Sequence, residues 1–318
     1  MKMIGKKLLS AILIGASLSF GVVAAGVDAA TKPVSVQVQE TNRDFKSAKI
    51  DKNITRIRNG AGDLMYLVEG KNKAALIDTG VGVGDLKKYV SSLTNKPYVV
   101  IITHGHVDHA AGTAQFDEVY MSRKDRSLFR EHTALENRMG YVGASNPKWA
   151  ETLSERNYQP LDNPDRFKDL KEGMSFDLGG VHLDIYDLPG HTQGSVAVLI
   201  RENRALLTGD GANMFTFLWS NETLGLTSYK KSLQRLQKAT AGKFDKMYCS
   251  HGGGDLTVDY LERLIEDCDI ILAGKDDKVD FEFMGQHSLI AFEINPMDHT
   301  RVDGGIGNIV YDPNRIYE

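Results

Sequence analysis

Short apolar runs, each bounded by glycine, asparagine or another turn residue, recur along the chain from about residue 54. Runs of β-branched and aromatic residues of this length between turn residues predict strands, whereas apolar side chains at a spacing of three and four predict helices. In the first half the predicted strands are residues 54–57, 64–68, 74–78, 98–103 and 119–121, and the predicted helices are residues 84–93 and 123–137. Residues 139–169 show no clean periodicity.

A second series with the same make-up follows. Its predicted strands are residues 174–176, 181–188, 195–200, 205–208 and 246–250, the first four as two hairpins, and its predicted helices are residues 229–239 and 256–273. Two similar halves predict an α/β protein, a four-layer αββα sandwich of two mixed β-sheets packed face to face with helices outside. Residues 281–311 add strand-like runs, so residues 31–318 are expected to form one domain with a β-rich C-terminal extension from about residue 276.

The N-terminus has the composition of an export signal. The first seven residues contain three lysines, residues 8–26 are uncharged and apolar, and small residues follow up to Ala29 and Ala30. This order is typical of a signal peptide, so we expect residues 1–30 to be removed and the mature chain to begin near Thr31. The alternative is an uncleaved anchor, because the apolar stretch approaches the roughly 20 residues that a spanning helix needs. The protein is expected to be secreted or periplasmic, without stable membrane association after cleavage.

Charge and composition narrow the class of partner. The chain has 318 residues, of which 42% are hydrophobic and 25% charged, and a formal net charge of −4, values typical of a soluble protein. This charge balance provides no stripe of basic residues that could bind the phosphates of a nucleic acid. A nucleic-acid partner is therefore not expected, and a small-molecule substrate is expected instead. The oligomeric state stays open.

The two cysteines, Cys249 and Cys268, exclude a disulfide-dense scaffold and allow at most one bridge. A bridge is possible in an oxidising compartment, but it is not favoured. Cys249 ends a predicted strand and Cys268 lies late in a predicted helix, and nothing in the sequence fixes the distance between them.

The densest set of metal-ligand residue types lies directly after the predicted strand 98–103. His104, His106, Asp108 and His109 fall within six residues. On a strand the first two histidines would point to the same side, and a turn would let Asp108 and His109 face a neighbouring point. A pair of adjacent metal ions fits this arrangement.

Three more candidates lie in glycine-containing loops near the ends of predicted strands, namely His191, Asp210 and His251. Each has a structural alternative, since a single histidine usually packs or lies at the surface and an aspartate often serves a turn. The remaining histidines are expected at the surface or in packing, and His132 could lie near the cleft. They are His132, His182, His287 and His299.

Together these positions resemble the five motifs of the metallo-β-lactamase superfamily, over about residues 54–273. The motifs fall at Asp78, at His104 to His109, at His191, at Asp210 and at His251. The resemblance implies a first zinc held by His104, His106 and His191, and a second held by Asp108, His109 and His251. It implies further that Asp210 bridges both ions and that Asp78 supports the ligand loops.

The implied cofactor is zinc, two ions per chain, with manganese or iron next by ligand type. Two divalent ions can hold a bridging hydroxide whose pKa falls from about 15.7 towards about 7. Asp108 would orient this hydroxide and pass its proton to the leaving group.

The resemblance also bears on the substrate, because β-lactamases generally lack an aspartate at the position of Asp210, whereas glyoxalase II-type thioesterases, lactonases and phosphodiesterases have it. An ester, lactone or thioester hydrolase is therefore expected. The alternatives are a phosphodiesterase, a β-lactamase-like amide hydrolase, a mononuclear-iron persulfide dioxygenase using His104, His191 and Asp210, and a non-catalytic binding domain. Aromatic residues near the site are expected to contact substrate, although packing under long loops explains each equally well. They are Tyr141, Trp149, Phe215, Phe217 and Trp219.

Overall fold

The computed structural model describes residues 44–283 and 286–318, so the predicted signal peptide and its cleavage site lie outside the described residues. The strands of this part form three sheets. The first is mixed, with β1 to β4 antiparallel and β4 to β7 parallel. In spatial order its strands are β1 (Phe45–Asp51), β2 (Ile54–Asn59), β3 (Leu64–Glu69), β4 (Ala74–Ile77), β5 (Tyr98–Ile101), β6 (Val119–Met121) and β7 (Lys168–Asp169).

The second sheet is also mixed, because β11 and β13 are parallel while their neighbours run antiparallel. In spatial order its strands are β14 (Asp255–Leu256), β13 (Lys246–Tyr248), β11 (Ala205–Leu207), β10 (Val196–Ile200), β9 (His182–Asp187) and β8 (Ser175–Asp177). The third sheet has the order β12 (Phe215–Leu218), β17 (Asn308–Tyr311), β16 (Gln286–Ile290) and β15 (Val279–Phe283).

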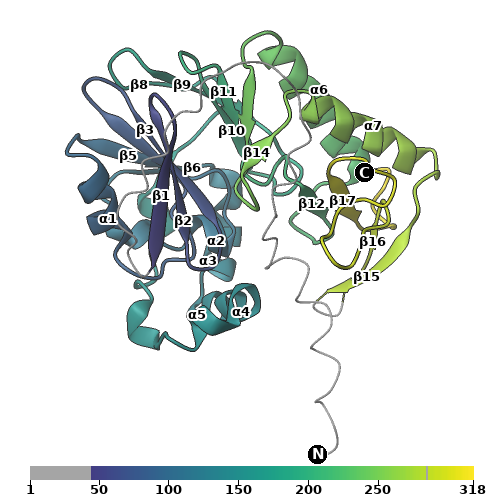
Figure 1. Cartoon of the computed structure of the whole chain (residues 1–318), viewed down its shortest axis with the longest axis horizontal. Coiled ribbons are helices and arrows are strands. Elements are labelled where there is room, and N and C mark those ends of the chain that lie inside the picture. Colours follow the sequence, from purple (N-terminus) through teal and green to yellow (C-terminus); the bar gives the residue numbers. More distant parts are fainter. Residues whose placement is uncertain (1–43, 284–285) are drawn as a thin grey trace, which may run out of the picture.

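Several helices pack on the outer faces of the first two sheets (Figure 1). The α-helices are α1 (Leu86–Leu93), α2 (Val107–Ala110), α3 (Arg126–His132), α4 (Leu135–Ser145), α5 (Pro147–Ala150), α6 (Leu226–Thr240) and α7 (Tyr260–Leu272). Short 3-10 turns span η1 (Thr113–Gln115), η2 (Arg123–Asp125), η3 (Glu155–Asn157) and η4 (Pro164–Arg166). No helix in the described ranges is long and apolar enough to cross a bilayer.

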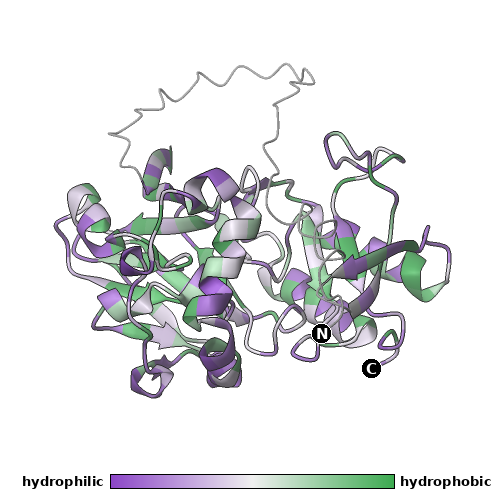
Figure 2. Ribbon diagram, turned by 90° about the horizontal axis from the view of Figure 1, so that it is seen from below, coloured by the Kyte–Doolittle hydropathy of each residue, from purple (hydrophilic) through white to green (hydrophobic). Residues whose placement is uncertain are grey.

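Three apolar clusters hold the four layers together. Between the two large sheets, Val68 and Ile77 of the first pack with Ile185 and Val198 of the second. The outer face of the first sheet packs against α1, and that of the second against α6 and α7. Figure 2 shows hydrophobic colouring on the strands within these layers and hydrophilic colouring on many of the outer loops. The predicted αββα sandwich is confirmed.

The strand-like runs of the C-terminal extension form a third sheet with β12, a strand from the body of the chain that was not predicted. Phe215 of β12 lies opposite Asn308 of β17, in parallel (Figure 1). The strand-like C-terminal runs therefore build onto β12 and pack beside α7, where Ile309 and Tyr311 join the apolar cluster of that layer. A short strand whose partner lies about ninety residues away gives no local signal.

The prediction of one helix over residues 123–137 is wrong. Helix α3 ends at His132, where the Thr133 hydroxyl donates to the Phe129 carbonyl, and Ala134 turns to extended backbone before α4 begins. Such local bonds from threonine compete with helix propagation. The stretch without clean periodicity that follows contains the end of α4 and all of α5.

The two cysteines form no disulfide in the described structure. Cys249 and Cys268 are both buried and both free, so the bridge that was not favoured is absent there.

Candidate metal centre

Four strand ends deliver the candidate ligands and their support to one place. Asp78 directly follows β4, and His104 comes three residues after the end of β5, its parallel neighbour. In the second sheet Asp210 follows β11 and His251 follows β13, which are also parallel. Parallel neighbours end at the same edge of a sheet, so each sheet presents two loops on one side.

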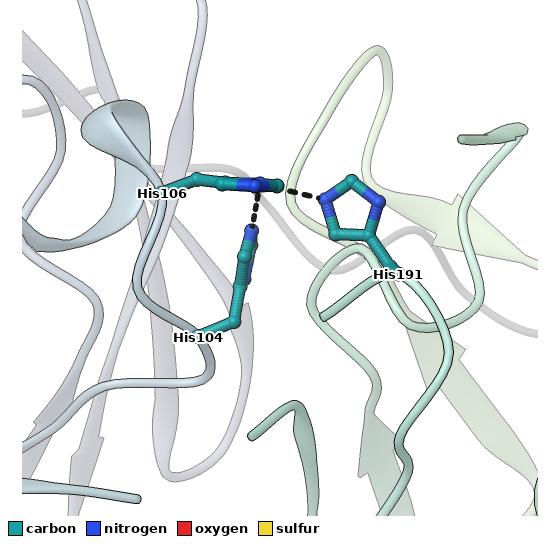
Figure 3. Close-up of side chains that lie close together, drawn as sticks. All are labelled: His104, His106 and His191. Carbon is teal, nitrogen blue, oxygen red and sulfur yellow. Dashed lines mark hydrogen bonds between the residues drawn. The ribbon is translucent and has the colours of Figure 1, made fainter. Parts of the chain in front are cut away.

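The first cluster joins the loop after β5 to the loop between β9 and β10. His104 Nε2 lies 3.1 Å from His106 Nδ1, and His191 Nε2 lies 2.9 Å from the same nitrogen. Figure 3 shows the three rings pointing toward one another from two sides of the site. Nitrogen atoms this close, without a carboxylate among them, form a group that could hold a metal ion.

The second cluster contains Asp108, His109, Asp210 and His251. His251 Nε2 lies 3.1 Å from Asp210 Oδ2 and 3.2 Å from Asp108 Oδ2, while His109 Nε2 lies 3.6 Å from Asp210 Oδ1. The same Asp210 carboxylate reaches the first cluster, because its Oδ2 is 3.9 Å from His191 Nε2. Asp210 thus faces both groups.

Outer hydrogen bonds fix which nitrogen of three imidazoles faces a cluster, those of His104, His109 and His191. His109 Nδ1 donates to Asp78 Oδ2 at 2.9 Å, and His191 Nδ1 donates to the Phe217 carbonyl at 2.9 Å. The Thr103 hydroxyl donates to Asp78 and accepts from His104 Nδ1 at 3.1 Å. With Nδ1 donating outward in these three rings, Nε2 points into the site, which is how outer partners orient metal-binding histidines.

The site also contains buried polar atoms that the protein leaves unsatisfied. His109 Nε2 and Asp210 Oδ1 are buried and have no hydrogen-bond partner in the described part of the chain. Buried polar atoms without a partner are costly, so an arrangement that leaves two of them facing each other requires a further group. Neutral imidazoles and carboxylates suit zinc, and the residues present fit a pair of divalent ions.

The charges of the metal-free chain differ between the two clusters. Burial and the neighbouring imidazoles lower the pKa of His191 to about 4, and burial lowers that of His104 well below its ordinary value, so both rings are neutral. Burial also lowers the pKa of His251, but Asp210 and Asp108 outweigh it and raise that pKa to about 10. The first cluster is therefore ready to bind a cation, and the second must release protons to do so.

Two buried aspartates hold the ligand loops without facing the clusters. Asp78, at a left-handed φ of 64°, accepts from the Thr103 amide at 2.7 Å as well as from the two side chains above. Asp125 accepts from the amides of Gly105 and Gly194 at 2.9 and 2.7 Å, and so ties the two loops of the first cluster together. Asp125 was missed from the sequence because it lies in a predicted helix with no nearby motif.

The aromatic residues that were expected to contact substrate pack against other side chains or form a local hydrogen bond. Trp149 and Phe215 are each 7% exposed and belong to different apolar clusters, and Phe217 and Trp219 pack partly buried beside Phe215. Phe217 reaches the site through its carbonyl, which holds His191. The Tyr141 hydroxyl donates to Asp63 at 2.6 Å.

The other histidines separate into one that joins the site and three that do not. The His132 ring stacks on His106 with centroids 4.8 Å apart, and burial lowers its pKa to about 4. His182 instead pairs with Glu202 at 2.7 Å. His287 and His299 contribute to none of the candidate metal groups in the described part of the chain.

A family model described as "Metallo-beta-lactamase superfamily" matches residues 62–251, more than half of the chain. The chain belongs to this superfamily. The matched region begins just before β3 and ends at His251, so it contains both clusters and the strands whose ends carry them, while β1, β2 and β14 lie outside it. Membership confirms the family that the motifs resemble.

Curated relatives match at lower identity and over part of their length. "Acyl-coenzyme A thioesterase MBLAC2" of Bos taurus is 26% identical over 164 residues, which are 46% of this chain and 57% of that protein. The Gallus gallus protein of the same name is 28% identical over 207 residues, 59% of this chain and 71% of that protein. "Hydroxyacylglutathione hydrolase GloC" of Haemophilus influenzae is 28% identical over 148 residues, 45% of this chain and 62% of that protein.

Among solved structures, "Metallo-beta-lactamase from Pontibacter korlensis" has a TM-score of 0.46 and 20% identity, covering 73% of this chain and 98% of that one.

Proposed function

We propose that this chain is an exported hydrolase that uses two zinc ions to cleave an ester, lactone or thioester. The position of Asp210 carries the proposal, because its carboxylate lies 3.9 Å from His191 of the first cluster and 3.6 and 3.1 Å from His109 and His251 of the second. A carboxylate between two such groups is suited to hold two cations a short distance apart.

The ligand sets are those that the sequence predicts. His104, His106 and His191 would hold the first ion, Asp108, His109 and His251 the second, and Asp210 both. Bound zinc would lower the pKa of a water molecule towards neutrality and polarise the oxygen of the substrate carbonyl.

The chain's own residues supply orientation and proton transfer. Asp108 is buried within the second cluster, its Oδ2 3.2 Å from His251 Nε2, so it can receive a proton from an attacking water and deliver it to the leaving group. Asp78 fixes the tautomer of His109, and the Phe217 carbonyl fixes that of His191. These contacts keep the Nε2 atoms of both rings directed at the site before any ligand binds.

The substrate class rests on the chemistry and on the relatives. The curated relatives include an acyl-coenzyme A thioesterase and a hydroxyacylglutathione hydrolase, names that describe thioester cleavage. A nucleophile generated from water can also attack esters and lactones. Thioesters, esters and lactones all present an acyl carbon and an oxygen or sulfur leaving group.

The complete second cluster distinguishes this proposal from a mononuclear-iron dioxygenase. That alternative needs His104, His191 and Asp210 and leaves Asp108, His109 and His251 without a role. Their donor atoms, together with Asp210, lie within 4.8 Å of one another.

A substrate panel tests the proposal. Zinc-loaded protein is offered lactones, oxygen esters, thioesters, β-lactams and phosphodiesters, and bound metal is measured on the same sample. We expect about two zinc ions per chain and turnover of an ester, lactone or thioester. His182→Ala, which alters a histidine that pairs with Glu202, is the matched control and should retain turnover. A protein that takes up a single iron and no zinc, or that cleaves phosphodiesters alone, contradicts the proposal.

A further inference from the structure

A third group of potential metal ligands lies on the outer side of His106. It combines His106 with His132, the last residue of α3, and Glu222, in the loop between β12 and α6. The two imidazoles stack with their planes 16° apart. The group therefore joins the first half of the chain to the second, next to the first cluster and separate from the second.

The spacing of these groups does not match ordinary hydrogen bonding. Glu222 Oε1 lies 3.7 Å from His132 Nε2 and 3.9 Å from His106 Nε2, beyond the roughly 3.2 Å limit of a good N–H···O bond. Two ligands held at about 2.1 Å from one tetrahedral zinc ion lie about 3.4 Å apart. The carboxylate is therefore only about 0.3–0.5 Å farther from each nitrogen than in a zinc site. Binding of one ion would also turn one of the two stacked rings, so that both lone pairs point at it.

The same protein shows how a histidine and a glutamate lie when they only pair with each other. His182 Nδ1 and Glu202 Oε1 are 2.7 Å apart, a normal hydrogen bond. Glu222 Oε1 instead lies nearly equidistant from two imidazole nitrogens, beyond the normal hydrogen-bond distance of both. One of these nitrogens, His106 Nε2, is buried and has no hydrogen-bond partner in the described ranges.

The two nitrogens of His106 serve different neighbours. Nδ1 faces His104 and His191, at 3.1 and 2.9 Å, and Nε2 faces Glu222. One face of the ring therefore belongs to the first cluster, and the other is directed at the outer group.

We propose that His106, His132 and Glu222 form a third divalent-cation site that shares the His106 ring with the first cluster. Two nitrogens and one carboxylate oxygen suit zinc and leave a coordination position open to water. The side chains are 15%, 30% and 29% exposed, so a cation can reach them from solvent. Since the His106 ring is shared with the first cluster and this group has fewer ligands of its own, this site fills after the other two.

Zinc uptake by the full-length protein tests the site without measuring hydrolysis, so the result is independent of the proposed function. Wild type, His132→Ala and Glu222→Gln are dialysed to equilibrium against rising free zinc, and bound zinc is determined by elemental analysis. We expect wild type to bind one zinc per chain more than either variant at saturation. The matched controls are His182→Ala and Glu202→Gln, which alter a hydrogen-bonded pair and should bind as wild type does.

Glu222→Gln keeps the size of a partly exposed side chain, so it should fold even if loss of the His132 ring disturbs α3. Cobalt(II) added to protein holding two zinc ions provides a second measurement, with visible d–d absorption expected in wild type and lost in both variants. Equal saturation of wild type and Glu222→Gln overturns the site. An equal loss in the His182 and Glu202 controls also overturns it, because uptake would then reflect surface histidines in general.

Discussion

Asp78→Asn is a sharp perturbation of the support beneath the metal centre. Asparagine has the shape of aspartate and tolerates the left-handed φ of 64° at this position. Its amide nitrogen, however, replaces one of two acceptor oxygens. Asp78 Oδ1 accepts from the Thr103 amide, while Oδ2 accepts from the Thr103 hydroxyl and from His109 Nδ1. Either orientation of the amide leaves a donor facing a donor.

If the amide nitrogen takes the Oδ2 position, His109 must accept there and move its proton to Nε2, the nitrogen that faces the second cluster. Two bonds to a buried, charged acceptor are lost or weakened, each worth about 1.5–3 kcal/mol, so we expect a loss of about 3 kcal/mol or more in the free energy of unfolding. For a chain of this size that lowers Tm by roughly 6–12 °C. Loss of an outer partner of a metal-binding histidine should weaken zinc affinity by about 10–100-fold.

Thermal unfolding of the metal-free protein and zinc competition against a chromophoric chelator measure the two effects separately. Asp245→Asn is the control, because Asp245 pairs with Arg204 at 2.8 Å with its side chain 55% exposed, and such pairs contribute about 1 kcal/mol or less. If Asp78→Asn retained both the Tm and the zinc affinity of wild type, the idea that Asp78 sets the tautomer of His109 would be refuted.

Three further predictions concern other parts of the chain. Arg138→Met should lower the free energy of unfolding in urea by about 3–5 kcal/mol, because the buried guanidinium donates to the carbonyls of residues 81, 82 and 159 at 3.0, 2.6 and 2.6 Å. A loss below about 1 kcal/mol would contradict this expectation. Burial raises the pKa of both thiols, that of Cys249 to about 12, so a thiol reagent at pH 8 should modify neither Cys249 nor Cys268 until the protein unfolds; rapid labelling of the folded protein would show otherwise. N-terminal sequencing should find the mature chain starting near Thr31 outside the cytoplasm, and an intact Met1 in soluble cytosol would exclude export.

The sequence predicts the two large sheets because their strands bury apolar side chains close to turn residues that mark each end. Residues 64–68 and 196–200, for example, are almost wholly apolar and lie at the interface between the sheets. Helix α4 lacks such a pattern, since two of its buried residues, Arg138 and Ser145, are polar. Its position is set by hydrogen bonds from Arg138 to carbonyls distant in the sequence, and the spacing of apolar residues does not indicate such bonds.

The residues of the candidate site also fall into those that the sequence predicts and those that it does not. Residues that follow strands within short motifs, such as His104 and Asp210, are predicted because the motif and the strand end coincide. Asp125 and Glu222 contact the His106 region across separations of about twenty and one hundred and sixteen residues, with no motif around either. Their roles follow from tertiary packing, which brings two loops together that the sequence describes separately.

The most direct test of the two-metal centre is Asp210→Ala, with bound zinc, the circular dichroism spectrum and turnover of the best panel substrate measured beside wild type. Because Asp210 lies 3.1 Å from His251 and 3.9 Å from His191, its removal should loosen the pairing of the two ions. We expect less than two zinc ions per chain, a folded spectrum and a rate lower by orders of magnitude. If Asp210 served a turn alone, its replacement would change stability by about 0.5 kcal/mol or less. Unchanged zinc content and unchanged turnover would contradict the bridging role.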